Sequence, residues 1–268
     1  MLSKEVIHSF NLKGKIEQLS GGQNTSLKVD HAVLKPVEDV HHYEWLLSVL
    51  NNIIPKSYRL SKPFRSQEGT FVNEGWICTR FEQGKEVNGR IEEKLKVAKL
   101  FHQDLSTVDY SDFPHVENPW TKAHRIAWQK DELPMDIHPK TEDIIMELLK
   151  KVQLKNQYNV QIVHADLSGN ILFDEVLPPL IIDFSPTIAP IEYAEAILVC
   201  DCIAWQKSKI SELELLPNNN TYREMMIRAV LFRLAVEAIF SKNELNRFME
   251  QYLVFKPIID YIDNGHYW

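Results

Sequence analysis

Most of what the sequence says about the fold lies in two neighbouring stretches, VHADLSGNILF at residues 163–173 and LIIDF at residues 180–184. Each stretch contains a short apolar run, and six residues that include Asp and Pro separate the two runs. Short apolar runs joined in this way are typical of a β-hairpin. We therefore predict antiparallel strands over Asn170–Phe173 and Leu180–Asp183.

The open end of this predicted hairpin gathers oxygen-bearing side chains. If Phe173 lies opposite Leu180, then Asn170 lies opposite Asp183, and Asp166 stands in the loop that enters the first strand. An amide oxygen beside a carboxylate suits Mg²⁺, which fills the rest of its shell with phosphate and water oxygens. The pattern favours phosphoryl transfer over the alternative that these residues only cap turns.

The residues before this hairpin read as short strands. The predicted strands are Lys15–Leu19, Thr25–Val29, Ala32–Pro36, Tyr58–Lys62, Thr70–Asn73 and Trp76–Phe81. One helix interrupts them at His41–Asn51. From Ile91 onward the apolar spacing is helical, as over Met225–Ile239 and Leu245–Tyr261. The change of pattern near Gly84 predicts a boundary between a β-rich part and a mainly helical part.

Two features of the β-rich part suit a nucleotide. Gly21, Gly22 and Asn24 lie in a turn between two predicted strands, and glycine lets a phosphate approach the backbone closely. An ordinary hairpin turn has the same composition. Lys35 ends an apolar strand, where it could contact phosphates or simply be a solvated edge lysine.

Taken together, these residues resemble the protein-kinase-like superfamily, and specifically its aminoglycoside and choline phosphotransferase branch. The resemblance rests on His-x-Asp, the Asn that follows, the hairpin and Ile-Asp-Phe. It implies that Asp166 is the catalytic base that orients the acceptor hydroxyl. It also implies that His164 braces the loop and that Asn170 and Asp183 hold Mg²⁺.

The same resemblance assigns roles in the β-rich part. Lys35 would reach the α- and β-phosphates with Glu44 as its ion-pair partner, and Glu38 is a rival for that pairing. The glycine-containing turn would cover the phosphates. A backbone segment after the last strand would bind adenine; its residues are Thr79, Arg80, Phe81 and Glu82.

The sequence departs from the family pattern at two places. The usual loop has four residues between Asp and Asn, whereas residues 167–169 make only three, and Gly169 would permit a tighter turn. Ser185 stands where small-molecule kinases have Glu and protein kinases have Gly. Asp201 is either a buried anchor below the loop, as the resemblance implies, or part of the polar face of a helix.

Composition excludes several classes of function. The 268-residue chain has 30 Lys and Arg against 37 Asp and Glu, a net charge of −7, which argues against general attraction to nucleic acid or anionic lipid. The start lacks the apolar run of a signal peptide, and the most apolar window, Ala194–Trp205, is too short to cross a bilayer. We expect a cytoplasmic protein with a small-molecule acceptor and no nucleic-acid or membrane partner. The oligomeric state cannot be read from the sequence.

The resemblance implies an α+β, two-lobed protein-kinase-like fold, with a small antiparallel β lobe containing one helix and a larger, mainly helical lobe. Residues 1–82 would be the nucleotide-binding lobe and residues 83–268 the catalytic and substrate lobe. The expected activity is γ-phosphate transfer from ATP or GTP, with Mg²⁺, to a hydroxyl of a small molecule. Two alternatives stay open: a nucleotide-binding regulatory pseudokinase, and a metal-dependent hydrolase with His164 and Asp166 as ligands.

Overall fold

A computed structural model describes residues 2–19, 25–152 and 158–265, which divide into two units. Within these limits, the first unit comprises residues 2–86, 107–116 and 170–184, and the second comprises residues 87–106, 117–169 and 185–265. The division differs from the expected single boundary after residue 82. The predicted hairpin belongs to the first unit because its strands pair with strands there.

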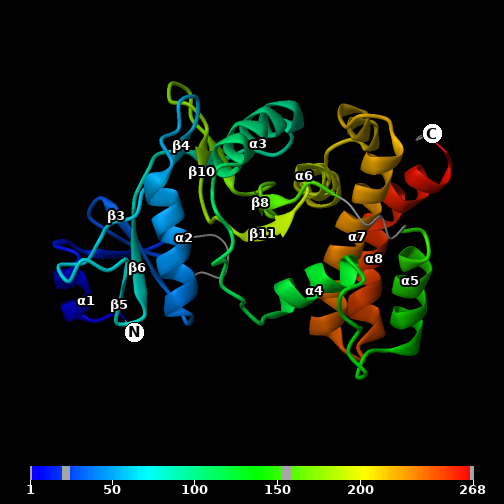
Figure 1. Ribbon diagram of the computed structural model, residues 1–268, viewed down its shortest axis with the longest axis horizontal. Helices are drawn as coiled ribbons and strands as arrows, with labels where there is room; N and C mark the ends of the chain where they lie inside the picture. The colour runs from blue at the N-terminus through cyan, green and yellow to red at the C-terminus, as the bar shows by residue number, and fades with distance from the viewer. Residues whose placement is uncertain (1, 20–24, 153–157, 266–268) are drawn as a thin grey trace. The chain divides into compact units, whose positions relative to one another are not determined.

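The first unit contains a five-stranded antiparallel sheet (Figure 1). In spatial order its strands are β1 (Ile16–Gln18), β2 (Leu27–Val29), β3 (Ala32–Pro36), β6 (Trp76–Arg80) and β5 (Val72–Asn73). Strand β3 forms because its residues alternate: Ala32 and Leu34 are fully buried, while Val33 and Lys35 are partly exposed. The strands predicted from the sequence are all present, some of them shorter than expected.

Two helices accompany this sheet. The predicted helix α2 (Val40–Asn52) begins at Asp39, whose carboxylate accepts a hydrogen bond from the His42 N–H at 2.9 Å. Helix α1 (Lys4–Ser9) was not predicted. It begins at Ser3, whose hydroxyl accepts from the Val6 N–H, and it packs Val6 into the apolar cluster of the sheet.

A second sheet in the first unit holds the predicted hairpin. Its strands, in spatial order, are β4 (Arg59–Leu60), β10 (Leu180–Ile181), β9 (Ile171–Phe173) and β7 (Lys85–Glu86). All pairs are antiparallel except β4 with β10. Gly84 lies so close to β9 that an added Cβ would stand 2.8 Å from the Cβ of Leu172, which explains why glycine precedes β7.

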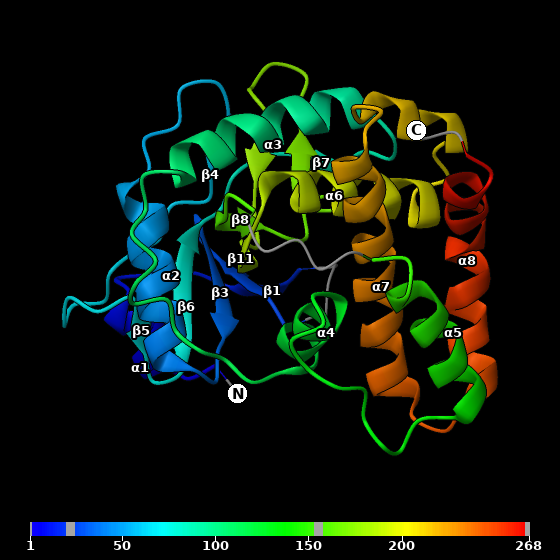
Figure 2. The ribbon, with the colours of Figure 1, turned by 45° about the vertical axis from the view of Figure 1, so that its right-hand side comes forward.

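The second unit is mainly helical, with one two-stranded antiparallel sheet formed by β8 (Gln161–His164) and β11 (Pro186–Ala189). Its helices are α3 (Ile91–Leu105), α4 (Pro119–Ala127), α5 (Pro139–Leu149), α6 (Ile191–Trp205), the 3₁₀ helix η1 (Ile210–Leu215), α7 (Asn220–Ser241) and α8 (Leu245–Asp263). Helix α7 is the centre of this packing. It contacts α4, α5, α6 and α8, and Figure 2 shows α5 and α8 beside it.

These features confirm the predicted fold class. An antiparallel sheet with few helices forms the first unit, and helices dominate the second. Helix α6 is buried on all sides from Tyr193 to Cys202, which explains the apolar window in the sequence. No helix in the described parts of the chain is both long and apolar enough to cross a bilayer.

Candidate functional site

In the first unit, a lysine and a carboxylate from distant parts of the sequence form an ion pair. The Nζ of Lys35, on β3, lies 3.2 Å from the Oδ1 of Asp183, which follows β10. The side chains are 33% and 51% exposed, so solvent and ligands can reach both. The structure thus brings together the predicted phosphate-binding lysine and a predicted Mg²⁺ ligand.

The expected partner of Lys35 was wrong. The Glu44 carboxylate accepts a hydrogen bond from the backbone N–H of Val72 at 2.7 Å, and the ion pair of Lys35 is with Asp183. Glu44 lies on α2, which packs against β5, so its carboxylate satisfies a donor at the edge of the sheet. The rival Glu38 forms no ion pair with Lys35 either, as far as the described residues show.

The register of the hairpin differs by one residue from the prediction. Leu180 pairs with Leu172 rather than with Phe173, and the N–H of Ile182 donates to the carbonyl oxygen of Asn170 at 3.0 Å. Asn170 therefore lies opposite Ile182, not Asp183. Phe173 ends β9 as predicted, and its strand partner is Lys85 on β7.

Asp183 leaves the strand in an unusual backbone conformation. Its φ is +46°, in the left-handed region, which costs a non-glycine residue on the order of 1 kcal/mol. The turn expected at Gly169 is present over residues 168–170, yet Gly169 is not among the described residues with positive φ. Strain of this kind is often retained at functional sites.

The donor set at this end of the hairpin fits Mg²⁺. Asn170 and Asp183 supply an amide and a carboxylate oxygen, which are hard ligands, and half of the Asp183 side chain is open to solvent. Mg²⁺ needs only one or two protein oxygens when phosphate and water complete its shell. No group of three His, Cys, Asp or Glu side chains gathers as a metal site within the described ranges, so the ligand set of the hydrolase alternative is not formed there.

The predicted adenine segment is mostly engaged with its neighbours. Thr79 pairs with Val33 on β3, Arg80 donates its N–H to Lys62, and Phe81 donates its N–H to His31. The Glu82 carboxylate bonds to Arg59 at 3.3 Å, while its backbone N–H has no partner in the part of the chain that the structure describes. Of the four residues, Glu82 therefore offers a backbone donor to a base. Gly21, Gly22 and Asn24 lie outside the described residues.

In the second unit, residues 165–169 form the Asp166 loop, which His164 braces. The His164 ring is buried, and its Nδ1 accepts a hydrogen bond from the Asp166 N–H at 3.2 Å. The N–H of His164 in turn donates to Nε2 of the buried His102 at 3.1 Å. Burial is the main reason that the pKa of His102 falls to about 3, so His102 stays neutral and can accept this bond.

A buried lysine holds the other end of the Asp166 loop. The Nζ of Lys94, on α3, donates to the carbonyl oxygen of Ser168 at 2.8 Å and to Oε1 of Gln206 at 2.6 Å. Gln206 also donates to the same Ser168 oxygen, at 2.9 Å. Sequence reasoning missed Lys94, although a charged residue among the apolar positions of an amphipathic helix was a usable signal.

The carboxylate of Asp166 is held by an arginine. Arg233, on α7, donates from Nη2 to Oδ1 of Asp166 at 2.7 Å and forms two hydrogen bonds to Asp201. Asp201 is fully buried, which establishes it as an anchor beneath the loop rather than part of a polar helix face. Arg233 was missed because it lies within the apolar helical pattern predicted over Met225–Ile239.

The predicted site residues thus fall into two sets, each described within its own unit. Lys35, Asn170 and Asp183 belong to the first unit, and His164 and Asp166 belong to the second. Along the chain, three residues separate Asp166 from Asn170, and the division between the units passes between Gly169 and Asn170.

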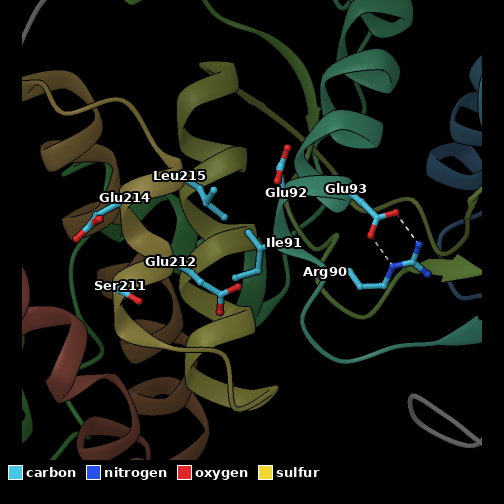
Figure 3. A pocket seen from close by; sticks show the side chains of 8 residues that line it. All are labelled: Arg90, Ile91, Glu92, Glu93, Ser211, Glu212, Glu214 and Leu215. Atoms are coloured by element: carbon cyan, nitrogen blue, oxygen red, sulfur yellow. Dashed lines mark hydrogen bonds and ion pairs between the residues drawn. The ribbon is translucent and has the colours of Figure 1, made fainter.

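The second unit also has a hollow of about 450 Å³ between α3 and η1 (Figure 3). Its lining residues are Arg90, Ile91, Glu92, Glu93, Ser211, Glu212, Glu214 and Leu215. On the α3 side of the hollow, Glu93 pairs with Arg90 and Glu92 pairs with Lys96. These two carboxylates are therefore already neutralised by cations of α3 and its cap. None of the predicted site residues lines this hollow.

The fold is similar to that of solved small-molecule phosphotransferases. The chain superimposes on a ligand-free thermostable mutant of the aminoglycoside phosphotransferase APH(4)-Ia with a TM-score of 0.65, 15% identity and 99% of each chain covered. The spectinomycin phosphotransferase APH(9)-Ia with ADP and spectinomycin gives a TM-score of 0.61 at 15% sequence identity, with 95% of this chain and 92% of that chain covered. The choline kinase LicA from Streptococcus pneumoniae gives a TM-score of 0.57 at 13% sequence identity, with 97% of each chain covered.

No protein-family model and no curated protein matches the sequence. The structural likeness, at identities near 15%, therefore confirms the resemblance for the fold.

Proposed function

We propose that this protein is an ATP-dependent phosphotransferase that transfers the γ-phosphate to a hydroxyl of a small molecule. The observation that carries the proposal is the ion pair between Lys35 and Asp183. Within a protein-kinase-like fold, it gathers a cation for phosphates and a carboxylate for a metal at solvent-accessible positions. Phosphoryl transfer needs little else from the protein than such positioning and charge stabilisation.

In this proposal, residues 1–82 supply the nucleotide-binding groups and residues 83–268 the catalytic and acceptor-binding groups. Lys35 contacts the α- and β-phosphates, and the turn with Gly21, Gly22 and Asn24 covers them. The segment Thr79–Glu82 meets the base, with the Glu82 N–H as its donor. Solved structures of the similar phosphotransferases contain ADP, AMP-PNP or AMP, which favours ATP over GTP as the donor.

Asn170 and Asp183 hold Mg²⁺ in this proposal. Mg²⁺ held there would offset the negative charge that develops on the transferred group. Lys35 keeps the Asp183 carboxylate at the phosphate-binding end of β3, and it can move its Nζ from Asp183 to a phosphate oxygen over a short distance. Glu44 acts indirectly, because it fixes α2 to β5 at the edge of the sheet that contains β3.

Asp166 receives the proton of the acceptor hydroxyl and orients its oxygen toward the γ-phosphate. Its side chain is 45% exposed although Arg233 bonds to one of its oxygens, so an acceptor can reach the carboxylate. His164 holds the backbone of Asp166 through the N–H, and this bond leaves the carboxylate to the substrate. A small hydroxylated acceptor agrees with similar structures that contain hygromycin B or spectinomycin.

One observation favours a second function, a regulatory protein that binds nucleotide without turnover. The ion pair with Arg233 occupies one oxygen of the Asp166 carboxylate, which an acceptor hydroxyl would otherwise meet. The shortened loop between Asp166 and Asn170 points the same way. Both functions require nucleotide binding, and turnover separates them.

Thermal unfolding with and without Mg²⁺–ATP tests the proposed function. A ligand present at 100 times its Kd stabilises the folded state by about 2.7 kcal/mol, which shifts the melting temperature measurably. We expect this shift in the wild type and its loss in Lys35→Ala. Lys96→Ala is the matched control, because it breaks an exposed lysine–carboxylate pair on α3. A melting-temperature shift with GTP but not with ATP would identify GTP as the phosphate donor. No shift with either nucleotide at millimolar concentration would refute the proposal.

A further inference from the structure

Arg233 is a buried charge whose partners differ greatly in exposure. Its side chain is 8% exposed, so its guanidinium needs partners that replace water. The side chain of Asp201 is fully buried, whereas that of Asp166 is 45% exposed. Arg233 therefore connects an anchor in the helical core to a carboxylate at the surface.

The hydrogen bonds fix the direction of the guanidinium. Nε donates to Oδ1 of Asp201 at 3.0 Å, and Nη2 donates to Oδ2 of Asp201, so the two groups meet as a fork. Nη2 also donates to Oδ1 of Asp166 at 2.7 Å. Because two bonds to Asp201 already set the plane of the fork, the third bond sets where Oδ1 of Asp166 lies.

Aromatic rings restrict the arginine further. The centre of its guanidinium lies 5.1 Å from the ring of Trp205 and 4.7 Å from the ring of Phe232. Trp205 lies on the same helix as Asp201, one turn further on. These contacts favour the charged form and limit side-chain rotation.

The charge balance also sets Arg233 apart from a purely structural ion pair. Arg228, on the same helix, pairs with Glu224 at 2.8 Å, and both side chains are almost completely buried. In that pair one cation meets one carboxylate. Arg233 meets two carboxylates, and the one that is left at the surface is the group to which we assign the chemistry.

We propose that Arg233 is a positioning residue that holds the Asp166 carboxylate in the orientation needed to receive the acceptor proton. This inference rests on the proposed function. Arg233 touches neither nucleotide nor acceptor; it acts through Asp166, with Asp201 as its fixed support. The bond from the Asp166 N–H to His164 holds the backbone of Asp166 in place, and the bond from Arg233 holds the orientation of its side chain.

Lysine cannot replace arginine in this role. A lysine at position 233 keeps the positive charge but presents a single nitrogen, which cannot form a planar fork with Asp201 and bond to Asp166 in a set direction. Arg233→Lys therefore separates orientation from charge. Arg228→Lys is the matched control, because it replaces another buried arginine on α7 whose partners are Glu224 and the carbonyl oxygen of Ala127.

The experiment compares the wild type with Arg233→Lys and Arg228→Lys. We expect Arg233→Lys to lower kcat for ADP release, over a panel of hydroxylated acceptors, on the order of 10- to 100-fold. The KM for ATP and the Kd for Mg²⁺–AMP-PNP should stay within about twofold. Arg228→Lys should leave kcat unchanged even if it lowers the melting temperature. Unchanged kcat in Arg233→Lys, or an equal loss in Arg228→Lys, would overturn the inference.

A second measurement works without turnover. In protein labelled with ¹³C-aspartate, the Asp166 carboxyl resonance should shift in Arg233→Lys and stay in place in Arg228→Lys. An unchanged resonance in Arg233→Lys overturns the inference whatever the kinetics show. If the wild type and Asp166→Ala release the same trace of ADP, the proposed function fails, and the resonance alone then decides whether Arg233 positions Asp166.

Discussion

The ammonium group of Lys35 lies 3.2 Å from the carboxylate of Asp183, although 148 residues separate them in the sequence. The pair forms because β3 carries the lysine in one sheet of the first unit and β10 delivers the aspartate from another. A partly exposed pair of this kind adds little to stability, typically less than about 1 kcal/mol. Its place therefore suggests a role in ligand binding rather than in folding.

Two substitutions at this pair should affect nucleotide binding in different ways. Lys35→Ala removes the phosphate contact that we propose, so we expect weaker binding at every Mg²⁺ concentration. Asp183→Asn removes a metal ligand's charge, so we expect a weaker dependence of the nucleotide Kd on Mg²⁺. Calorimetric titrations over a series of Mg²⁺ concentrations measure both effects. Identical Mg²⁺ dependence in the wild type and Asp183→Asn would rule out Asp183 as a ligand.

Asp201 should make stability fall as the pH rises from about 4 to 6. Burial, opposed by Arg233, raises the pKa of its carboxyl from 3.8 to about 6. The folded state therefore holds a proton that the unfolded state has lost, so the charged form costs stability above pH 6. Relative to Asp201→Asn, the wild type should lose up to about 3 kcal/mol over this range. Chemical unfolding at several pH values measures the difference, and parallel curves would contradict the assignment.

His102 should have the opposite effect. Burial, with a smaller contribution from His164, lowers its pKa from 6.5 to about 3, so the unfolded state takes up a proton that the folded state does not. Its contribution to stability is complete above pH 6.5 and is lost as the pH falls toward 3, at about 1.4 kcal/mol per pH unit. His102→Gln should flatten this part of the unfolding profile. A variant as acid-sensitive as the wild type would show that His102 does not titrate in this way.

Gly84→Ala should destabilise the first unit. The new methyl group would stand 2.8 Å from the Cβ of Leu172, and such overpacking typically costs about 1–3 kcal/mol. Leu172→Ala cannot relieve the contact, because the Cβ remains, whereas Leu172→Gly removes it. Equilibrium unfolding of the two single variants and of Gly84→Ala with Leu172→Gly forms a double-mutant cycle. Additive effects would show that the contact is not made.

The sequence predicted the strands well because alternation and turn residues are local signals. Strand β3 was predicted with its observed bounds, since Ala32 and Leu34 point one way and the residues between them the other. Helix α4 was not predicted, because Pro119 at its start is a residue that commonly ends or interrupts helices. In the structure Pro119 is the first residue of the helix, where proline needs no N–H partner, and Asn118 caps it.

The contacts of the site depended on tertiary structure that the sequence does not display. The hairpin register differs by one residue from the prediction, because the lengths of two apolar runs do not determine how the strands align. Lys35 pairs with Asp183 because the folded first unit brings the end of β3 close to the residue that follows β10. Arg233 and Lys94 looked like ordinary interruptions of helical stripes, and only their buried partners reveal their connection to the Asp166 loop.

The most direct test of the central claim is a side-by-side turnover assay of the wild type and Asp166→Ala with Mg²⁺–ATP and a panel of hydroxylated small molecules. If Asp166 is the base, the variant should lose a factor on the order of 10²–10⁴ in ADP release while its nucleotide affinity stays nearly intact. A phosphorylated acceptor should form with the wild type in proportion to ADP. The same trace of ADP from both proteins with every acceptor, despite nucleotide binding, would contradict the phosphotransferase account and support the regulatory one.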